Sequence, residues 1–352
     1  MKVGIIGGNV GGFSAAILLR EKDIEVTVYE HKLTWDKPCG GILSSEYVKW
    51  LEKHEVILED KYGTPNYVFL INNRRYEEKA GKIIQFALSR EELQRKLWKR
   101  ADEVGVKINK RKISLGADIE SLCEEMDLIV VATGFNRLAA TLLGRIYKTE
   151  EKAVCRIAEI PTDIQYDEVL FEINTQTTGY GWVFPKRNRV NVGWGRQLGE
   201  GLTLREGFNR FIKLVNKKTS LDLEVPQEKI RGGKLPSDVN TLDKVFLSVH
   251  HNTPFVGIGD SIGLANPING GGMCNTFKSA IFLADAVTPP RFYGKQYVHA
   301  IKSELEEEWK YARKTRRRFK LATGNVITQQ MSKLILKVMG GVIVSKMFST
   351  YK

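Results

Sequence analysis

Two glycine-rich stretches, far apart in the sequence, combine residue types suited to binding phosphate. The first contains four glycines: Gly7, Gly8, Gly11 and Gly12. The second, Gly270–Gly272, also precedes a segment with helical character. Such turns bring backbone N–H groups close to electron-rich groups at the start of a helix. Glu30 lies 23 residues after Gly7, near the spacing of about 20 at which an acidic residue binds ribose hydroxyls. These residues predict a dinucleotide site.

The elements expected around the first turn form a βαβ unit. Val3–Ile6 predicts a buried strand, Phe13–Glu21 a helix and Val26–Glu30 a second strand. Asn9 replaces the middle glycine of the G-x-G-x-x-G pattern. We expect a positive φ at Asn9, because asparagine tolerates that conformation best after glycine. The alternative is a glycine-rich turn that binds no ligand.

Three later segments extend this unit. Ser89 is predicted to be the N-cap of a helix, with Glu92 as its capping-box partner. Leu128–Ala132 predicts a buried strand that ends at Thr133-Gly134, and another predicted strand ends at Asp260.

The stretch Gly179–Lys186, GYGWVFPK, alternates small and aromatic residues. Alternate side chains of a strand lie on one face, so Tyr180, Trp182 and Phe184 are expected to share a face. The turn PKRN and the run Val190–Trp194 predict a hairpin in a separate antiparallel sheet. The aromatic residues either fill the core beneath that sheet or form the wall of a binding chamber.

Composition limits the class of protein. A chain of 352 residues, 42% hydrophobic and 27% charged, accommodates two or three globular domains. The formal charge of +13 favours a phosphate-bearing substrate, a polyanion or an anionic membrane surface. No base-reading motif accompanies the basic clusters, so we do not expect nucleic acid as a partner. The four cysteines form no C-x-x-C pair, which argues against a structural metal site and a disulfide scaffold and favours a reducing cytoplasm.

The segment from Gln329 onward predicts an amphipathic, basic helix. Its apolar residues repeat at helical spacing, with Lys333, Lys337 and Lys346 between them. This helix either lies in a membrane interface or packs back on the domain. No uncharged apolar stretch approaches the roughly 20 residues needed to span a bilayer. We therefore expect a cytoplasmic protein, peripheral at the inner face of the membrane if this segment binds there.

Together these motifs resemble the geranylgeranyl reductase family of FAD enzymes, within the p-hydroxybenzoate-hydroxylase-like fold, and its archaeal membrane-lipid branch in particular. The resemblance rests on the N-terminal turn with Glu30, KPCGG (Lys37–Gly41), Arg90, YGWVFPK (Tyr180–Lys186) and GDSIGLANPINGGG (Gly259–Gly272). It implies an α/β fold: a Rossmann-type FAD-binding domain with an inserted antiparallel-sheet substrate domain and a C-terminal helical segment. The expected FAD-binding domain comprises residues 1–65, 89–148 and 243–290, the substrate domain 66–88 and 149–242, and the helical segment 291–352.

The resemblance also implies roles for single residues. Glu30 would hold the adenosine ribose, Arg90 the pyrophosphate side and Asp260 the ribityl chain. Ile113, expected at the end of a basic strand, would contact the adenine. The amides around Gly272 would stabilise the negative charge of a reduced isoalloxazine. The implied cofactor-binding residues are Gly7, Gly8, Asn9, Gly11, Gly12, Glu30, Cys39, Gly40, Gly41, Arg90, Ile113, Gly134, Asp260, Gly271, Gly272 and Met273.

The activity implied by the resemblance is reduction of C=C bonds in the prenyl chains of archaeal-type membrane lipids or their precursors. Tyr180, Trp182 and Phe184 would contact the prenyl chain, and Tyr180 would relay a proton. Cys39 is the second catalytic candidate, or else an inert small residue in a turn. No metal is implied.

Two features of the implied chemistry stay open. The electron donor is ferredoxin, reduced deazaflavin or NAD(P)H, and Thr133 stands where many NAD(P)H-dependent hydroxylases of this fold have aspartate. The alternatives to a reductase are a flavin-dependent monooxygenase or halogenase, and a non-catalytic flavin-bearing lipid-binding protein.

Overall fold

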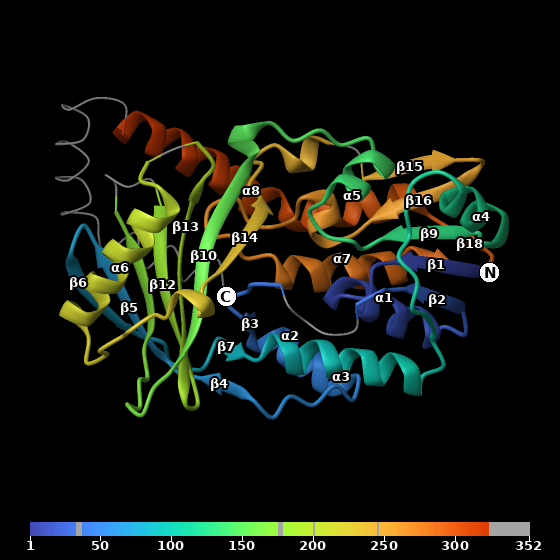
Figure 1. Cartoon of the computed structure of the whole chain (residues 1–352). Coiled ribbons are helices and arrows are strands. Elements are labelled where there is room, and N and C mark those ends of the chain that lie inside the picture. Colours follow the sequence, from blue (N-terminus) through green and yellow to red (C-terminus); the bar gives the residue numbers. More distant parts are fainter. Residues whose placement is uncertain (33–36, 175–178, 200, 245, 324–352) are drawn as a thin grey trace.

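The computed structural model describes residues 1–32, 37–174, 179–199, 201–244 and 246–323, with side chains to residue 317. Within them, two large sheets lie side by side and a long helix, α8 (Gly294–Thr323), runs along both (Figure 1). The predicted amphipathic segment from Gln329 lies outside the described residues.

The first sheet is the predicted nucleotide-binding sheet. Its strand order is β15 (Leu247–His250), β16 (Thr253–Gly257), β9 (Leu128–Val131), β1 (Lys2–Ile6), β2 (Glu25–Tyr29) and β8 (Lys107–Asn109). All neighbours are parallel except β15 and β16. Helix α1 (Val10–Arg20) packs against α3 (Arg90–Glu103) and α7 (Met273–Asp285). The carboxyl ends of β1, β9 and β16 therefore meet at one edge, where ligands bind in such sheets.

Asn9 differs from the sequence-based expectation. Its φ is −84°, and its side chain accepts a hydrogen bond from the Val10 N–H, so Asn9 is the N-cap of α1. The left-handed residue of the turn is Gly7, with φ +102°. The expected positive φ at Asn9 is therefore wrong, and the helix begins at Val10 rather than Phe13 because Asn9 caps it.

The capping box predicted at Ser89 forms only in part. The Ser89 side chain accepts from the Glu92 N–H at 3.2 Å. The Glu92 carboxylate, however, accepts from the backbone N–H groups of Glu59 and Asp60, each at 2.9 Å. The Glu92 carboxylate thus binds the turn at Glu59 and Asp60 to the start of α3, and it does not accept from the Ser89 N–H as a capping box requires.

The second sheet contains the aromatic strand. Its order is β14 (Arg231–Pro236), β10 (Lys152–Pro161), β13 (Arg189–Gln197), β12 (Gly179–Lys186), β11 (Val169–Ile173), β5 (Asn66–Ile71) and β6 (Arg74–Lys79). The predicted β12–β13 hairpin is confirmed, with Trp182 opposite Gly193. The sheet is not wholly antiparallel, since β5 and β11 pair in parallel.

Two apolar clusters cover the two faces of this sheet. Helix α6 (Leu204–Lys218) packs Phe208 and Phe211 with Trp194 on one face. Trp182 and Phe184 lie on the other face with Tyr67 and Phe69. A three-stranded sheet, β3 (Ile42–Ser44), β7 (Gln85–Leu88) and β4 (Lys61–Gly63), lies between the two large sheets (Figure 1).

Helix α8 (Gly294–Thr323) packs against α7, and its buried Trp309 donates to the carbonyl of Asp238 at 3.2 Å. The remaining elements are α2 (Ser45–Lys53), α4 (Ala117–Glu125), α5 (Arg137–Leu142), β17 (Val287–Thr288) and β18 (Arg291–Phe292). Among the described residues, none of the helices has the length and apolar character needed to cross a membrane.

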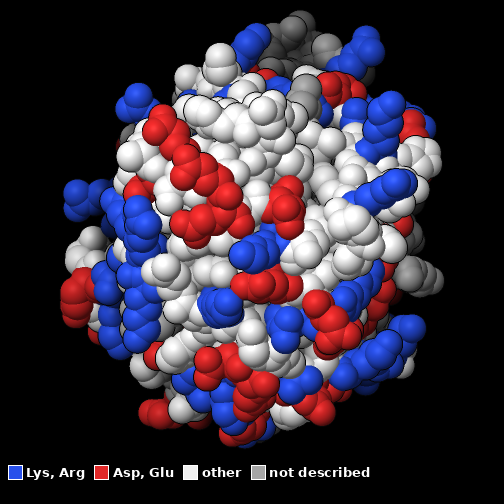
Figure 2. All heavy atoms as spheres, turned by 90° about the vertical axis from the view of Figure 1, so that its right-hand side faces the viewer, with Lys and Arg blue, Asp and Glu red and all other residues white. Residues whose placement is uncertain are grey.

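Charge is mixed on the surface at the end of the molecule where β1 begins. Figure 2 shows acidic and basic side chains interspersed there. The formal charge of +13 therefore does not produce a uniformly basic surface on this face.

Candidate functional site

The N-terminal turn brings Glu30 to the predicted phosphate-binding backbone. The Glu30 carboxylate accepts from the Gly8 N–H at 2.9 Å and from the Lys32 N–H at 2.8 Å. A Cβ on Gly12 would overlap the backbone oxygen of Gly7, so only glycine lets α1 start this close to β1. The first amides of α1 have no acceptor within the helix and point out of its N-terminus.

Arg90 joins this turn from α3. It is buried, and its guanidinium donates to Asn9 Oδ1 at 3.3 Å. Burial lowers the pKa of Arg90, while Cys39 and Asp260 act in the opposite direction. Residues from three other segments, Asn9, Cys39 and Asp260, thus surround the positive charge of Arg90.

Asp260 follows β16 in a short 3₁₀ helix, Gly259–Ile262. Its Oδ2 lies 3.7 Å from Lys37 Nζ. Its Oδ1 is buried and has no hydrogen-bond partner among the described residues. The Gly134 N–H donates to Ser261 Oγ at 3.0 Å, which places the end of β9 beside this turn. A buried acceptor without a donor indicates a ligand that donates a hydrogen bond to it.

The second glycine cluster opens α7 as predicted, with Gly272 as its N-cap. A Cβ on Gly272 would lie 3.0 Å from Asp260 Oδ1. The Gly271 N–H donates to Asn269 Oδ1 at 2.8 Å and is therefore already engaged. Of the three residues expected at an isoalloxazine, Gly272 and Met273 remain at the helix start, where amides have no intrahelical acceptor.

These residues fit FAD. A ribityl hydroxyl would satisfy Asp260 Oδ1, the start of α1 and Arg90 suit a pyrophosphate, and Glu30 suits a ribose. Strand β8 ends at Asn109, four residues before Ile113, so the expected position of Ile113 at a strand end is wrong. Ile113 is buried in the core of the first sheet, and its contact with the adenine stays a prediction.

The aromatic face meets this site through Tyr180. The Tyr180 hydroxyl donates to the carbonyl of Asn269, next to Gly270. The ring centroids of Tyr180 and Trp182 are 5.4 Å apart, and those of Trp182 and Phe184 are 6.1 Å apart. The predicted shared face is confirmed, and it reaches the loop before α7.

This face is covered by part of the KPCGG motif. Trp182 and Phe184 are only 6% and 8% exposed. A Cβ on Gly40 would lie 2.7 Å from the Phe184 ring and 3.5 Å from Trp182 Nε1, so the backbone of Gly40 packs directly on both rings. The aromatic residues therefore form a closed surface rather than an open wall, and a long ligand needs the cover to move.

Three polar residues beside the cover were not predicted. Lys186 is buried and pairs with Glu159, and Asn191 donates to the Cys39 carbonyl at 3.2 Å. The alternation that places Tyr180, Trp182 and Phe184 on one face also includes Lys186. The sequence therefore contained a signal that Lys186 shares this face. Glu159 and Asn191 carry no such signal, because only the strand register places them there.

Stability should depend on pH through Glu159. Burial raises the pKa of its carboxyl, but Lys186 and Arg189 outweigh burial and hold it below the ordinary value of 4.5. A carboxyl group whose pKa is lower in the folded state than in the unfolded state stabilises the fold when it is ionised. That stabilisation is present above the unfolded-state pKa and is lost as pH falls through the folded-state pKa. We expect Glu159→Gln to lose about 1–2 kcal/mol at neutral pH, a value reduced for the partial exposure of the carboxylate.

Thermal unfolding of Glu159→Gln and the unaltered protein across acidic pH tests this expectation. The difference should close below pH 4.5. Glu103→Gln, which removes pairs of Glu103 with Lys99 and Arg100 on the surface of α3, is the control and should change little. A difference that stays constant at all pH values would contradict the role of the ion pair.

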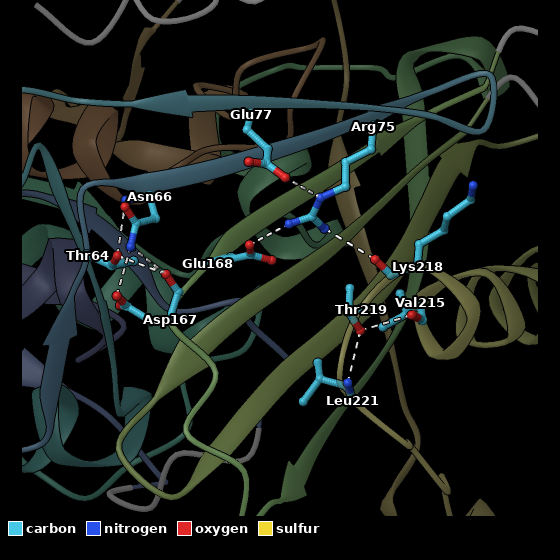
Figure 3. Close-up of polar contacts among 10 residues, drawn as sticks. All are labelled: Thr64, Asn66, Arg75, Glu77, Asp167, Glu168, Val215, Lys218, Thr219 and Leu221. Carbon is cyan, nitrogen blue, oxygen red and sulfur yellow. Dashed lines mark hydrogen bonds and ion pairs between the residues drawn. The ribbon is translucent and has the colours of Figure 1, made fainter.

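A polar cavity of about 440 Å³ lies elsewhere, at the outer edge of the second sheet. Figure 3 shows the polar contacts that engage its Arg75, Glu168 and Asp167 side chains. Arg75 binds Glu77, Glu168 and the Lys218 carbonyl, and Asn66 binds Asp167. This cavity shares no residue with the group around Arg90 and Asp260.

Comparisons with known proteins agree with this geometry. No family model matches the chain. The digeranylgeranylglycerophospholipid reductase of Thermoplasma acidophilum is 24% identical over 316 residues, which cover 80% of this chain and 76% of that protein. A geranylgeranyl bacteriochlorophyll reductase-like structure from the same organism has a TM-score of 0.67 at 19% identity and covers 96% of this chain and 95% of its own.

A flavin-dependent brominase has a TM-score of 0.69 at 12% identity, covering 97% of this chain and 94% of its own. The fold is therefore the predicted α/β flavoprotein fold. The names of these relatives agree with the prediction of an FAD-dependent oxidoreductase. The resemblance of the chain to the geranylgeranyl reductase family, indicated by its motifs, is confirmed by these comparisons.

Proposed function

We propose that the chain is an FAD-dependent reductase that saturates C=C bonds of geranylgeranyl chains in archaeal-type membrane lipids or their precursors. The observation that carries the proposal is the contact between the Tyr180 hydroxyl and the Asn269 carbonyl. It joins an aromatic surface suited to a prenyl chain to the loop that precedes the α7 N-terminus. The names of the relatives support the prenyl substrate.

The chain's own residues would hold FAD along the edge of the first sheet. Glu30 would bind the adenosine ribose, the start of α1 with Arg90 the pyrophosphate, and Asp260 the ribityl chain. When bound, FAD supplies the two electrons of the reduction. The N-terminus of α7 carries partial positive charge and would stabilise the negative charge of a reduced flavin held beside it.

The aromatic surface suits a prenyl substrate for an energetic reason. A prenyl chain that leaves a membrane gains little of the roughly 0.8 kcal/mol per CH₂ that transfer from water would provide. Contact with Trp182 and Phe184 must replace that gain through dispersion. Aromatic faces also stabilise positive charge on an alkene carbon during protonation. Tyr180 holds its proton on the Asn269 carbonyl and would release that contact to act as a relay.

Replacing Glu30 with glutamine should weaken FAD binding. The substitution keeps the shape but removes the charge that now faces the Gly8 N–H and would face the ribose hydroxyls. Loss of one charge-assisted hydrogen bond corresponds to about a tenfold rise in the Kd. Titration of the apoprotein with FAD, followed by flavin fluorescence, measures this change. An unaltered Kd would remove Glu30 from the site.

The proposed activity is tested with the purified holoprotein under anaerobic conditions. The bound flavin is reduced with dithionite, a geranylgeranyl lipid or geranylgeranyl diphosphate is added, and the products are weighed. We expect a gain of two hydrogens for each double bond reduced. Unchanged lipid with every substrate would contradict a reductase and leave a flavin-bearing lipid-binding protein.

The brominase of the same fold makes an oxygen-dependent flavin enzyme the second candidate. Products that appear only when oxygen is admitted, and that carry added oxygen or halogen, would identify it. Dithionite replaces the physiological donor, so the assay does not depend on whether that donor is ferredoxin, reduced deazaflavin or NAD(P)H. A cytoplasmic location at the inner membrane face completes the proposal, because the substrate is a membrane lipid.

A further inference from the structure

The segment Pro38–Gly41 forms a cover over the aromatic face. Gly41 is held at one end, where its carbonyl accepts from the Leu88 N–H at 2.9 Å. At the other end, Pro38 lies 4.0 Å from the position of a Cβ on Gly233. Between them, Gly40 packs on Trp182 and Phe184. The cover thus runs from β14 of the second sheet to β7 of the three-stranded sheet.

Asn191 connects three parts of this region. It lies in β13, opposite Phe184 on one side and Glu159 on the other, and is 1% exposed. Its Oδ1 accepts from Trp182 Nε1 at 2.9 Å. Its Nδ2 donates to the Cys39 carbonyl at 3.2 Å and to Glu159 Oε1 at 3.4 Å. One side chain therefore contacts the aromatic face, the cover and the Lys186–Glu159 ion pair.

The geometry of Asn191 allows the cover to move off the aromatic face with the loss of one Asn191 hydrogen bond. If the Cys39 carbonyl moves away, Nδ2 keeps Glu159 as an acceptor and Oδ1 keeps Trp182 as a donor. The amide is then not left unpartnered in the core, which would be far more costly than the loss of one hydrogen bond. Trp182 also keeps its orientation, so the aromatic surface remains formed when it is uncovered.

We propose that Asn191 is a positioning residue that latches Pro38–Gly41 over Trp182 and Phe184, and that a prenyl chain reaches this surface when the bond to Cys39 breaks. The inference rests on the proposed function for the identity of the ligand. It assigns to Asn191 control of substrate access, not a part in the chemistry.

If Asn191 holds the cover in place, loss of its hydrogen bond to the Cys39 carbonyl should increase access to the region of the cover. Asn191→Asp keeps an acceptor for Trp182 but cannot donate to the Cys39 carbonyl, and its charge faces Glu159. Asn191→Leu removes the bond without adding charge. In the holoprotein we expect both variants to raise the rate of Cys39 alkylation by iodoacetamide about tenfold, the effect of losing one buried hydrogen bond.

Asn216→Asp is the matched control. Asn216 lies in α6 and likewise donates to a carbonyl, that of Leu223 at 3.1 Å, far from the cover. Alkylation of Cys123, whose thiol contacts the carbonyl of His250, is the internal reference in each variant. Alkylated peptides are counted by mass spectrometry. A Cys39 rate in both Asn191 variants equal to that of Asn216→Asp would overturn the latch.

Steady-state kinetics with a geranylgeranyl lipid give the second readout. A larger open fraction lowers KM by the same factor, up to about tenfold, without raising kcat. A merely structural role would lower thermal stability and leave KM as it is in Asn216→Asp. Unchanged alkylation in an enzyme that still reduces lipid would refute the latch alone. Faster alkylation in a protein that reduces no lipid would refute the proposed function alone.

Discussion

Replacing Gly12 with alanine should abolish FAD binding. The added Cβ would overlap the backbone oxygen of Gly7, and neither group belongs to a flexible side chain that can move aside. The start of α1 would have to shift away from β1, and with it the amides that face a pyrophosphate. We expect protein purified without visible flavin absorbance and with strongly reduced thermal stability.

Gly81→Ala is the control for this substitution. Gly81 has no atom within 4 Å of its Cβ position, so the added methyl group meets open space. That variant should keep its flavin. A Gly12→Ala protein that retained flavin at the level of Gly81→Ala would show that the turn does not contact the cofactor.

Trp182→Ala should abolish prenyl reduction while FAD stays bound. Trp182 fills the space above Gly193, where any Cβ would overlap its indole ring. Truncating a buried tryptophan costs about 3–5 kcal/mol of stability. Loss of the same contacts with the prenyl chain corresponds to a fall in kcat/KM of about 100-fold or more for each bound flavin.

Trp194→Ala separates this effect from general destabilisation. Trp194 is fully buried on the opposite face of the same sheet, against Gly207 of α6. Both variants should lose stability, but only Trp182→Ala should lose activity when rates are divided by flavin content. The Phe substitutions at the two positions provide a milder pair if either alanine variant does not fold. Equal losses of activity at the two positions would contradict a substrate-contacting role for Trp182.

Local patterns were sufficient to predict the elements that carry the site. The βαβ unit, the β12–β13 hairpin and the shared face of Tyr180, Trp182 and Phe184 follow from apolar periods and turn residues within short windows. The glycines before α7 were found in the same way. Each helix or strand of these units is predicted from the residues within it and next to it.

The wrong predictions concern polar side chains that form hydrogen bonds with segments distant in the sequence. Asn9 caps α1, and Arg90 from α3 binds its side chain. The Glu92 carboxylate binds the backbone N–H of Glu59 instead of that of Ser89. No period in the sequence reports such tertiary contacts.

The cover over the aromatic face was not expected from the sequence. The contact of Cys39–Gly41 with the flavin stays a prediction, and the structure adds that Gly40 packs on Trp182 and Phe184. Asn191 could not be selected from sequence, because its role arises from strand register with Glu159 and Phe184. Substitutions at Asn191 can therefore test how a substrate reaches the aromatic face.

The central claim is that reduced FAD in this protein passes its electrons to a prenyl double bond. The most direct measurement follows the flavin absorbance of the dithionite-reduced holoprotein, freed of excess dithionite, in the absence of oxygen. Addition of a geranylgeranyl lipid should restore the oxidised spectrum, and addition of the fully saturated lipid should not. A spectrum that stays bleached with both lipids and recovers only when oxygen is admitted would contradict the claim.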